Sequence, residues 1–310
     1  MTGAIRSIGR GKTARRGGGR RNDRQGGAVE LWMRSHVALV YLFLYFPIVI
    51  VVLFSFNATD RQVTDWQGFS LKWYGRVLGD RQVQNALFNS LFVASITAII
   101  STIVGTTAAL GLQRAPRWFR GPFSALTYTS IIVPEIVIAL ATLVFFSTAF
   151  DFASPILGFR LKTGFATIIA AHCLFNISLV ILLVQARLNG MDRTHVEASY
   201  DLYGSPWRTF WQITFPQLLP AIVAGFLLSF TFSFDDYVIT TFVSGAGTTT
   251  LPLYVFGQIR KGVTPATNAV AAVMLLITLS TLIIGQFLVS RNAKRKGQSG
   301  SMTSMVVEQR

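Results

Sequence analysis

The sequence has 310 residues, of which 51% are hydrophobic and only 13% are charged. Soluble domains carry about 25% charged residues, so this composition argues against an ordinary soluble enzyme and against a disordered chain. Lys and Arg outnumber Asp and Glu by 28 to 13, a net charge of +15, but the basic residues gather at the two ends and in short segments between long apolar stretches. The composition therefore predicts an integral membrane protein.

The first 35 residues are predicted to form a disordered basic arm. Most of this segment is rich in Gly and Arg, with almost nothing apolar to bury, which is typical of a chain that cannot build a core. Gly11-Lys12-Thr13 looks like the end of a phosphate-binding loop, but the glycine required five residues earlier is replaced by Arg6. We therefore expect no nucleotide site, and we assign the charge of the arm to membrane lipid headgroups rather than to nucleic acid.

Six apolar stretches after the arm are long enough to cross a bilayer, which takes about 20 residues. None of the six contains Lys or Arg. The predicted fold is an all-α integral membrane protein with six transmembrane helices, a membrane domain over residues 36–290 and a basic tail over residues 291–310. The stretches are His36–Phe56, Ala86–Leu112, Pro122–Phe150, Thr163–Ala186, Leu218–Val243 and Ala269–Ser290.

The basic residues outside the spans predict the orientation of the chain. With both ends on one side, that side holds 20 Lys and Arg residues and the opposite side holds 8. Basic residues are retained on the cytoplasmic side of a membrane. Both termini, and the segments between spans two and three and between spans four and five, are therefore predicted to be cytoplasmic.

Catalytic and metal-binding patterns are not found in the sequence. His36, His172 and His195 lie in different segments, without the spacing of metal ligands. His172 lies inside the fourth predicted span, where we expect it to form an interhelical hydrogen bond. The chain is therefore expected not to be an enzyme and to need no cofactor or metal.

The loop at residues 187–217 has the composition of an ordered structure. Glu197–Leu202 is predicted as a short helix, Gly204-Ser205-Pro206 as a bend and Trp207–Ile213 as a second short helix, before the fifth span. Exposed aromatic residues on such a knob indicate a docking site or a membrane-interface anchor. These aromatic residues are Tyr200, Tyr203, Trp207 and Phe210.

The same loop resembles the EAA loop of binding-protein-dependent ABC importer permeases. The resemblance rests on Glu197-Ala198-Ser199, Asp201-Leu202 and Ile213-Thr214-Phe215-Pro216, at the family's spacing. The slot six residues after Glu197 is glycine in the family but Tyr203 here, followed by Gly204, so we expect the bend to be displaced by one residue. The resemblance assigns an ATPase-coupling role to Glu197, Ala198, Ser199, Asp201, Gly204, Ile213 and Pro216.

A narrower resemblance surrounds the fifth span. The segments Leu228–Ile239, Thr250–Leu253 and Gly262–Pro265 look like the second permease subunit of spermidine/putrescine importers. This resemblance implies a type I ABC importer permease fold in the bacterial cell (inner) membrane. It also implies three partners: a second permease subunit in a heterodimer, a cytoplasmic ATPase dimer and an extracytoplasmic substrate-binding protein.

Three acidic residues lie within the predicted spans: Glu135, Asp235 and Asp236. A carboxylate at the bilayer centre costs about 2.5–3.5 kcal/mol on insertion scales, and the spans of this chain contain no basic residue to neutralise it. A cationic substrate or a basic residue of a partner is the natural counter-charge. The alternative is an interhelical polar contact without a substrate role, which stays open for Asp236 and more so for Glu135. Pro134 breaks the helix before Glu135 and can widen a cavity there.

Aromatic faces attract ammonium groups, so the aromatic residues beside the acidic pair join the predicted substrate path. The path as predicted comprises Asp235, Asp236, Glu135, Tyr237 and Phe234. Other interpretations are an ABC permease for an iron carrier, a sugar or an anion, an ion-coupled secondary transporter, and a membrane scaffold that acts through its basic arm.

Overall fold

The structure, a computed structural model, describes residues 22–60, 65–158, 160–192 and 194–295. Within these ranges it is almost entirely helical, with an isolated bridge between Asn57 and Phe69 as the one pairing of extended backbone. The helices are α1 (Asn22–Phe54), α2 (Lys72–Gly79), α3 (Arg81–Arg114), α4 (Arg117–Ile132), α5 (Glu135–Leu157), α6 (Phe165–Asn189), α7 (Thr194–Asp201), α8 (Pro206–Thr209), the π-helical turn η1 (Phe210–Thr214), α9 (Phe215–Asp235), α10 (Val238–Val243), α11 (Leu251–Ile259) and α12 (Pro265–Arg295).

The chain divides into two units, one ending at Val51 and the other beginning at Val52. Helix α1 forms the described part of the first unit. It begins at Asn22 and so takes in residues 22–35 of the predicted arm. Good helix formers such as Leu31 and Met33, together with the ion pair between Arg34 and Glu30 one turn apart, favour this extension. Residues 1–21 and 296–310 of the two predicted tails lie outside the described residues.

Six helical stretches among the described residues are long and apolar enough to cross a membrane, the number that the sequence predicts. The stretches are Glu30–Phe54, Arg81–Arg114, Glu135–Ile156, Phe165–Asn189, Pro206–Asp235 and Pro265–Phe287. Two predicted spans have the wrong bounds. The predicted span Pro122–Phe150 is interrupted between α4 and α5, and the predicted span Leu218–Val243 is interrupted between α9 and α10.

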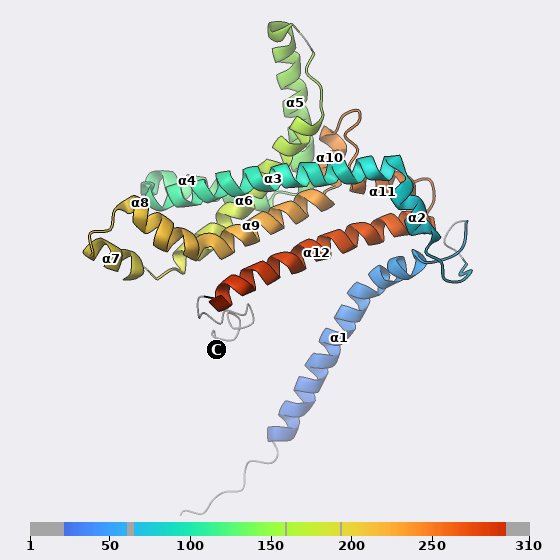
Figure 1. Cartoon of the computed structure of the whole chain (residues 1–310), viewed down its shortest axis with the longest axis horizontal. Coiled ribbons are helices and arrows are strands. Elements are labelled where there is room, and N and C mark those ends of the chain that lie inside the picture. Colours follow the sequence, from blue (N-terminus) through green and yellow to red (C-terminus); the bar gives the residue numbers. More distant parts are fainter. Residues whose placement is uncertain (1–21, 61–64, 159, 193, 296–310) are drawn as a thin grey trace, which may run out of the picture. The chain divides into compact units, whose positions relative to one another are not determined.

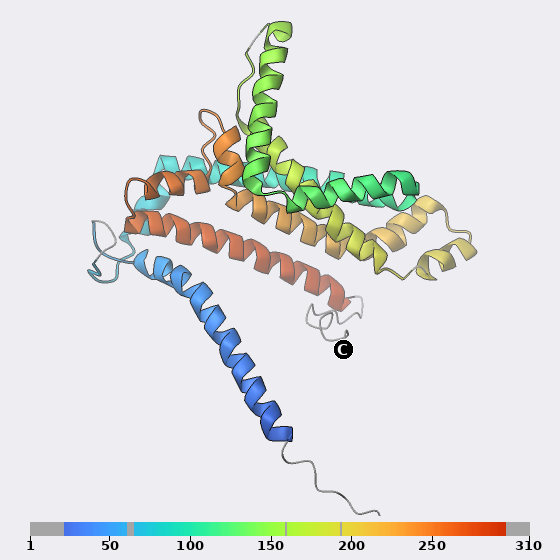
Figure 2. The same ribbon diagram turned by 180° about the vertical axis from the view of Figure 1, so that it is seen from behind.

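Helices α3, α6 and α9 form the centre of the second unit and pack against one another (Figures 1 and 2). Close packing depends on Gly105 of α3, where an added Cβ would lie 2.7 Å from the Cβ of Val180 on α6. Gly225 of α9 faces the same valine, at 3.4 Å from its Cγ1. Small residues let helices in lipid approach closely and gain van der Waals contact, so Val180 marks the point where the three helices meet.

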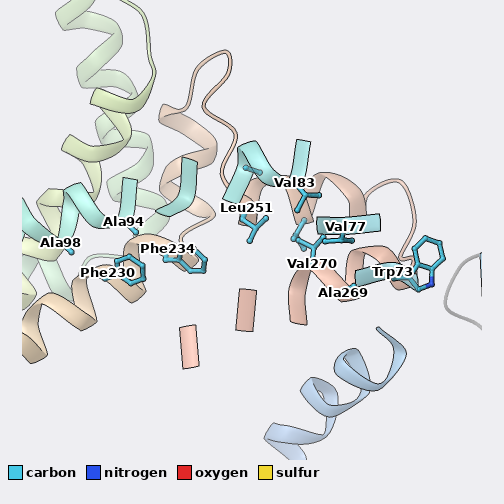
Figure 3. Close-up of a cluster of buried hydrophobic side chains, with 12 residues drawn as sticks. Trp73, Val77, Val83, Ala94, Ala98, Phe230, Phe234, Leu251, Ala269 and Val270 are labelled. Carbon is cyan, nitrogen blue, oxygen red and sulfur yellow. The ribbon is translucent and has the colours of Figure 1, made fainter. Parts of the chain in front are cut away.

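A hydrophobic cluster joins α3 and α9 of this centre to three further helices, α2, α11 and α12 (Figure 3). Phe230 and Phe234 of α9 stack at 5.8 Å between ring centroids and lie beside Ala94 and Ala98 of α3. The other end of the cluster in Figure 3 is formed by residues of three further helices: Trp73 and Val77 of α2, Leu251 of α11, and Ala269 and Val270 of α12. The short helices α2 and α11 are thereby fixed to the long ones.

Helix α5 is packed differently from the central three. It contacts α10 and α6 and extends away from the other helices of its unit in both views (Figures 1 and 2). A buried cluster holds its first half, through Ala139 of α5, Val93 of α3, Ile168 and Ala171 of α6, and Ile239 and Val243 of α10. The start of α5 is therefore held firmly where α6 and α10 meet.

Candidate functional site

The first interruption separates α4 from α5 at Val133 and Pro134. Val133 has an extended conformation (φ −60°, ψ 130°) and Pro134 lies just before the first residue of α5. A proline disfavours a helical conformation in the residue before it, which ends α4 here. The break makes Glu135 the first residue of α5, where a negative charge is favoured by the helix dipole.

The second interruption, between α9 and α10, is made by a side chain rather than by a proline. Asp236 has an extended backbone (φ −65°, ψ 128°). Its carboxylate accepts hydrogen bonds from the backbone N–H of Ile239 (3.2 Å) and Thr240 (2.8 Å) and from the Thr240 hydroxyl (2.7 Å). These are donors of the first turn of α10 that have no partner within that helix. Asp236 therefore caps α10 and ends the predicted fifth span.

His172 of α6 holds Asp236 from the other side. Its Nε2 lies 3.0 Å from Oδ2 of Asp236, and its Nδ1 lies 2.7 Å from the hydroxyl of Ser233. Because a carboxylate only accepts, Nε2 carries a proton and donates it to Asp236, while Nδ1 shares a hydrogen bond with the Ser233 hydroxyl. His172 is 2% and Asp236 8% exposed. The predicted interhelical hydrogen bond of His172 is confirmed.

Glu135 and Asp236 meet at a cavity of about 180 Å³, although they come from separate interruptions. Their carboxyl groups interact with each other. Asn176 and Phe175 of α6 and Phe232 of α9 also line the cavity, and its lining, in the part of the chain that the structure describes, includes no Lys or Arg. The arrangement concentrates negative charge in a small space.

The other predicted path residues lie elsewhere. Asp235 is exposed and accepts a hydrogen bond from Thr278 of α12 (3.1 Å). Tyr237 stacks on Phe256 of α11 at 3.9 Å between ring centroids. Phe234 is 1% exposed and packs in the cluster of Figure 3. The structure thus brings Glu135 and Asp236 together and places Asp235, Tyr237 and Phe234 outside the lining of the cavity.

Asn176 lines the cavity but is not among the residues predicted from the sequence. One signal was available: Asn176 follows His172 by four residues, which places both on one face of a helix. The Nδ2 group of Asn176 donates to the backbone oxygen of His172 at 2.9 Å. Its Oδ1 is buried and has no hydrogen-bond partner among the described residues.

The EAA-like loop, residues 194–216, lies at the far end of α9 from this cavity (Figure 1). Two short helices form it, α7 and α8, as predicted, and α7 covers most of the predicted Glu197–Leu202 helix. Glu197, Ala198 and Asp201 are exposed on α7. Ser199 faces inward and its hydroxyl lies 2.8 Å from that of Thr209, which ties α7 to α8.

The bend between α7 and α8 is made by Tyr203. This residue has φ 56°, in the left-handed region, and the N–H groups of Tyr203 and Gly204 donate to the carbonyls of Tyr200 (2.9 Å) and Ser199 (2.8 Å). That pair of bonds is the Schellman arrangement, in which glycine usually takes the left-handed position. The predicted displacement of the bend to Gly204 is therefore wrong. Tyr203 stands at the position that glycine occupies in the family, and it adopts the left-handed conformation itself.

Gly204 is required for close approach. An added Cβ would clash with the Ser199 hydroxyl and would lie 2.7 Å from its carbonyl oxygen. A groove of about 870 Å³ follows the loop on this side, and Ala198, Gly204, Ile213 and Pro216 of the predicted coupling set line it. Large apolar side chains project from the tip, with Leu202 81%, Tyr203 99% and Trp207 72% exposed. Such a surface is typical of a docking site.

From α8 the helix continues through η1 into α9 without a break. Phe215 N–H donates to the carbonyl of Phe210, five residues earlier. Pro216 has no N–H and its ring crowds the carbonyl four residues before it, and a wider π-helical turn relieves that crowding. The prolines at the start of the predicted fifth span therefore modify the helix without ending it.

Several known proteins are similar to this chain in sequence. The family described as binding-protein-dependent transport system inner membrane component matches residues 101–295. The putrescine transport system permease protein PotI of Escherichia coli (strain K12) is 37% identical over 267 residues, covering 86% of this chain and 93% of PotI. The spermidine/putrescine transport system permease protein PotC of Haemophilus influenzae (strain ATCC 51907 / DSM 11121 / KW20 / Rd) is 37% identical over 256 residues, covering 82% of this chain and 95% of that protein.

The fold has a solved counterpart. A chain from the crystal structure of a bacterial ABC transporter involved in the import of the acidic polysaccharide alginate matches with a TM-score of 0.72 at 12% identity, covering 87% of this chain and 98% of that chain. At this identity the likeness is one of fold. Together with the six apolar helices and the EAA-like loop, the family match identifies a multi-pass protein of the bacterial inner membrane. The chain belongs to the family of binding-protein-dependent transport system inner membrane components.

Proposed function

We propose that this chain is a permease subunit of an ABC importer that moves polyamines such as putrescine and spermidine. The observation that carries the proposal is the cavity where Glu135 and Asp236 meet without a lining Lys or Arg among the described residues. The names of the relatives, putrescine and spermidine/putrescine permeases, support the same substrate class.

Electrostatics favours a cation in this cavity. Two carboxylates close together in a poorly solvated site repel each other, and each is costly within a membrane. An ammonium group removes both penalties, and the aromatic rings of Phe175 and Phe232 attract the same charge. A sugar or an anion offers no such compensation, so these substrates fit the cavity poorly.

Asp235 has a separate place in the proposal. It is exposed in the isolated subunit and accepts a hydrogen bond from Thr278. We assign Asp235 and Tyr237 to the part of the path that a second permease subunit completes, and Phe234 to packing behind it. The second subunit forms a heterodimer with this chain, and membrane lipid contacts the remaining apolar faces.

Transport is proposed to be driven from outside this chain. A cytoplasmic ATPase dimer hydrolyses ATP and an extracytoplasmic substrate-binding protein delivers the polyamine, while this chain hydrolyses nothing. The EAA-like loop docks on the ATPase through its groove and its exposed tip, around Glu197, Ser199 and Asp201. Closure of the ATPase dimer moves the loop, and α9 transmits this motion to the cavity.

Uptake tests the proposal. Cells carrying the complete transporter should accumulate radiolabelled putrescine and spermidine, and Glu135→Gln should lower transport by roughly 10- to 100-fold, because a hydrogen bond to a charged group contributes about 1.5–3 kcal/mol. Glu30→Gln, the same substitution in the other unit of the chain, is the matched control and should leave uptake unchanged. Uptake of a sugar or an anion in place of polyamine would overturn the substrate class.

The proposed orientation, with both termini cytoplasmic, has its own test. On a Cys173→Ser background, a cysteine at exposed Gln67 should react with an impermeant thiol reagent added to intact cells. A cysteine at exposed Gln212 of the EAA-like loop should react after permeabilisation only. The opposite labelling pattern would reverse the orientation.

A further inference from the structure

Asn176 has a hydrogen-bonding group that the fold leaves unused. The residue is 2% exposed, and its Oδ1 has no partner among the described residues. A buried polar atom without a partner is destabilising, and a ligand that donates a hydrogen bond to it removes that penalty. The asparagine also lines the cavity that contains Glu135 and Asp236, which places this residue at the proposed substrate site.

The orientation of the Asn176 amide follows from its neighbour. The other end of the amide donates to the backbone oxygen of His172 at 2.9 Å. A carbonyl oxygen only accepts, so the NH₂ group faces His172 and Oδ1 is the end of the amide that is left without a partner among the described residues. The lining of the cavity thereby includes one residue with an unsatisfied neutral acceptor, in addition to the two carboxylates.

Asp236 has little capacity left for a ligand. Its Oδ2 already receives hydrogen bonds from Thr240 and His172, and its Oδ1 receives one from Ile239. Asp236 therefore contributes charge and geometry, whereas Asn176 keeps an acceptor atom without a partner among the described residues and Glu135 interacts with Asp236 alone of the groups named here. Phe175 and Phe232 also line the cavity, and their rings form an edge-to-face pair with centroids 5.5 Å apart.

We propose that Asn176, Glu135 and the Phe175–Phe232 pair form a subsite for one primary ammonium end of the substrate, and that Asn176 selects a primary ammonium over an N-methylated one. A primary ammonium carries three N–H donors. Glu135 and Asn176 Oδ1 accept from it, and the aromatic pair stabilises its charge. A trimethylated nitrogen keeps the charge but has no N–H, so it gains nothing from Asn176. The cavity, about 180 Å³, is smaller than the 300–1,000 Å³ of typical ligand pockets, which suits one end of a diamine.

This inference rests on the proposed function, and binding measurements separate the two. The purified permease–ATPase complex in lipid nanodiscs, without the substrate-binding protein, is titrated with labelled putrescine and with its analogue that bears three methyl groups on each nitrogen. The wild-type complex should bind putrescine at least 10-fold more tightly than the analogue. Asn176→Leu should weaken putrescine binding about 10- to 100-fold, the range for one hydrogen bond to a charged group, and leave binding of the analogue unchanged.

Two further variants distinguish recognition from structure. Phe232→Leu should weaken both ligands by a similar factor, because the ring interacts with charge alone. Asn89→Leu is the matched control: Asn89 is also buried, but its amide donates to the carbonyls of Gly247 and Thr249. It should reduce the amount of folded complex without changing the preference for putrescine. Asn176→Ser, which is smaller, should reproduce the loss if the leucine variant fails to fold.

The outcomes separate cleanly. If the wild-type complex neither binds nor transports polyamines, the proposed function is wrong. If it binds putrescine, and both Asn176 variants keep wild-type affinity and preference, the ammonium subsite is wrong and the proposed function stands. An equal loss for both ligands in the Asn176 variants would also overturn the selective role of this residue.

Discussion

The uninterrupted and the interrupted helices of this protein have different roles. Helices α3 and α6 run for 34 and 25 residues without a break and meet at Gly105 and Val180. The chain changes direction instead at Pro134, at Asp236 and at Tyr203. Two of these interruptions form the cavity, and the third forms the bend of the EAA-like loop. The continuous helices pack together as a frame, whereas the proposed substrate cavity and the proposed docking loop lie where helices end.

The interruption at Asp236 should be the most sensitive point. Asp236→Ala removes the cap of α10 and leaves buried His172 without its carboxylate partner. The variant leaves His172 Nε2 and the first-turn donors of α10 without their acceptor, and each buried unsatisfied donor costs about 1–3 kcal/mol, so we expect a large drop in the thermal stability of the purified complex. Asp235→Ala, one position away and bonded among the described residues to Thr278, should cost less than about 1.5 kcal/mol. Equal losses in the two variants would contradict the role given to Asp236.

The frame formed by α3 and α6 can be tested with two glycines of the same helix. Gly105→Ala should destabilise the protein by about 1–3 kcal/mol, because the new methyl group overlaps Val180. Gly111→Ala meets no atom within 4 Å and should instead stabilise α3 by up to about 1 kcal/mol, the difference in helix propensity. Thermal unfolding of the two purified variants measures both effects. A stabilising Gly105→Ala would mean that the two helices are not closely fixed there.

The smallest expected effect concerns the bend at Tyr203. Tyr203→Gly should stabilise the loop by roughly 0.5–1 kcal/mol. The left-handed conformation costs a residue with a side chain about 1–2 kcal/mol, and glycine avoids that cost. Part of the gain is lost because glycine gives the unfolded chain more conformational entropy. Tyr203→Ala keeps the strained conformation and should be neutral, because the tyrosine ring is 99% exposed. Local hydrogen exchange of the loop amides is the appropriate measurement. Equal protection in the two variants would remove the strain argument.

The sequence predicts the continuous helices well and the interruptions unevenly. Long apolar stretches without Lys or Arg are sufficient to identify six spans. Pro134 carries a local signal, and the sequence analysis used it to place a cavity beside Glu135, although it drew one span through the break. Residues 228–243 contain neither Pro nor Gly, so no helix breaker marks Asp236. The local bonds that cap α10 could form with any suitably placed Asp, and the partner that holds Asp236 in place, His172, is 64 residues away in the chain.

The predicted site shows the same limit. Spacing alone cannot tell which of two adjacent carboxylates faces a cavity, because neighbours lie about 100° apart on a helix. The aromatic residues beside them were grouped by sequence proximity, yet Phe232 lines the cavity and Phe234 packs in the core. Tyr203 could not be predicted as the left-handed residue, because tyrosine has no intrinsic preference for that conformation and Gly204 beside it does.

The continuous helix from Pro206 to Asp235 has a mechanical consequence. It contains 30 residues, which at 1.5 Å per residue makes a rod about 45 Å long, with the loop at one end and the acidic cavity at the other. Turning such a rod by roughly 5° about its loop end displaces the opposite end by about 4 Å, more than the length of a hydrogen bond. Under the proposed function the rod would act as a lever between the loop and the cavity. A displacement of that size would separate Asp236 from His172, so a small rotation at the loop would open or close the contacts around the cavity.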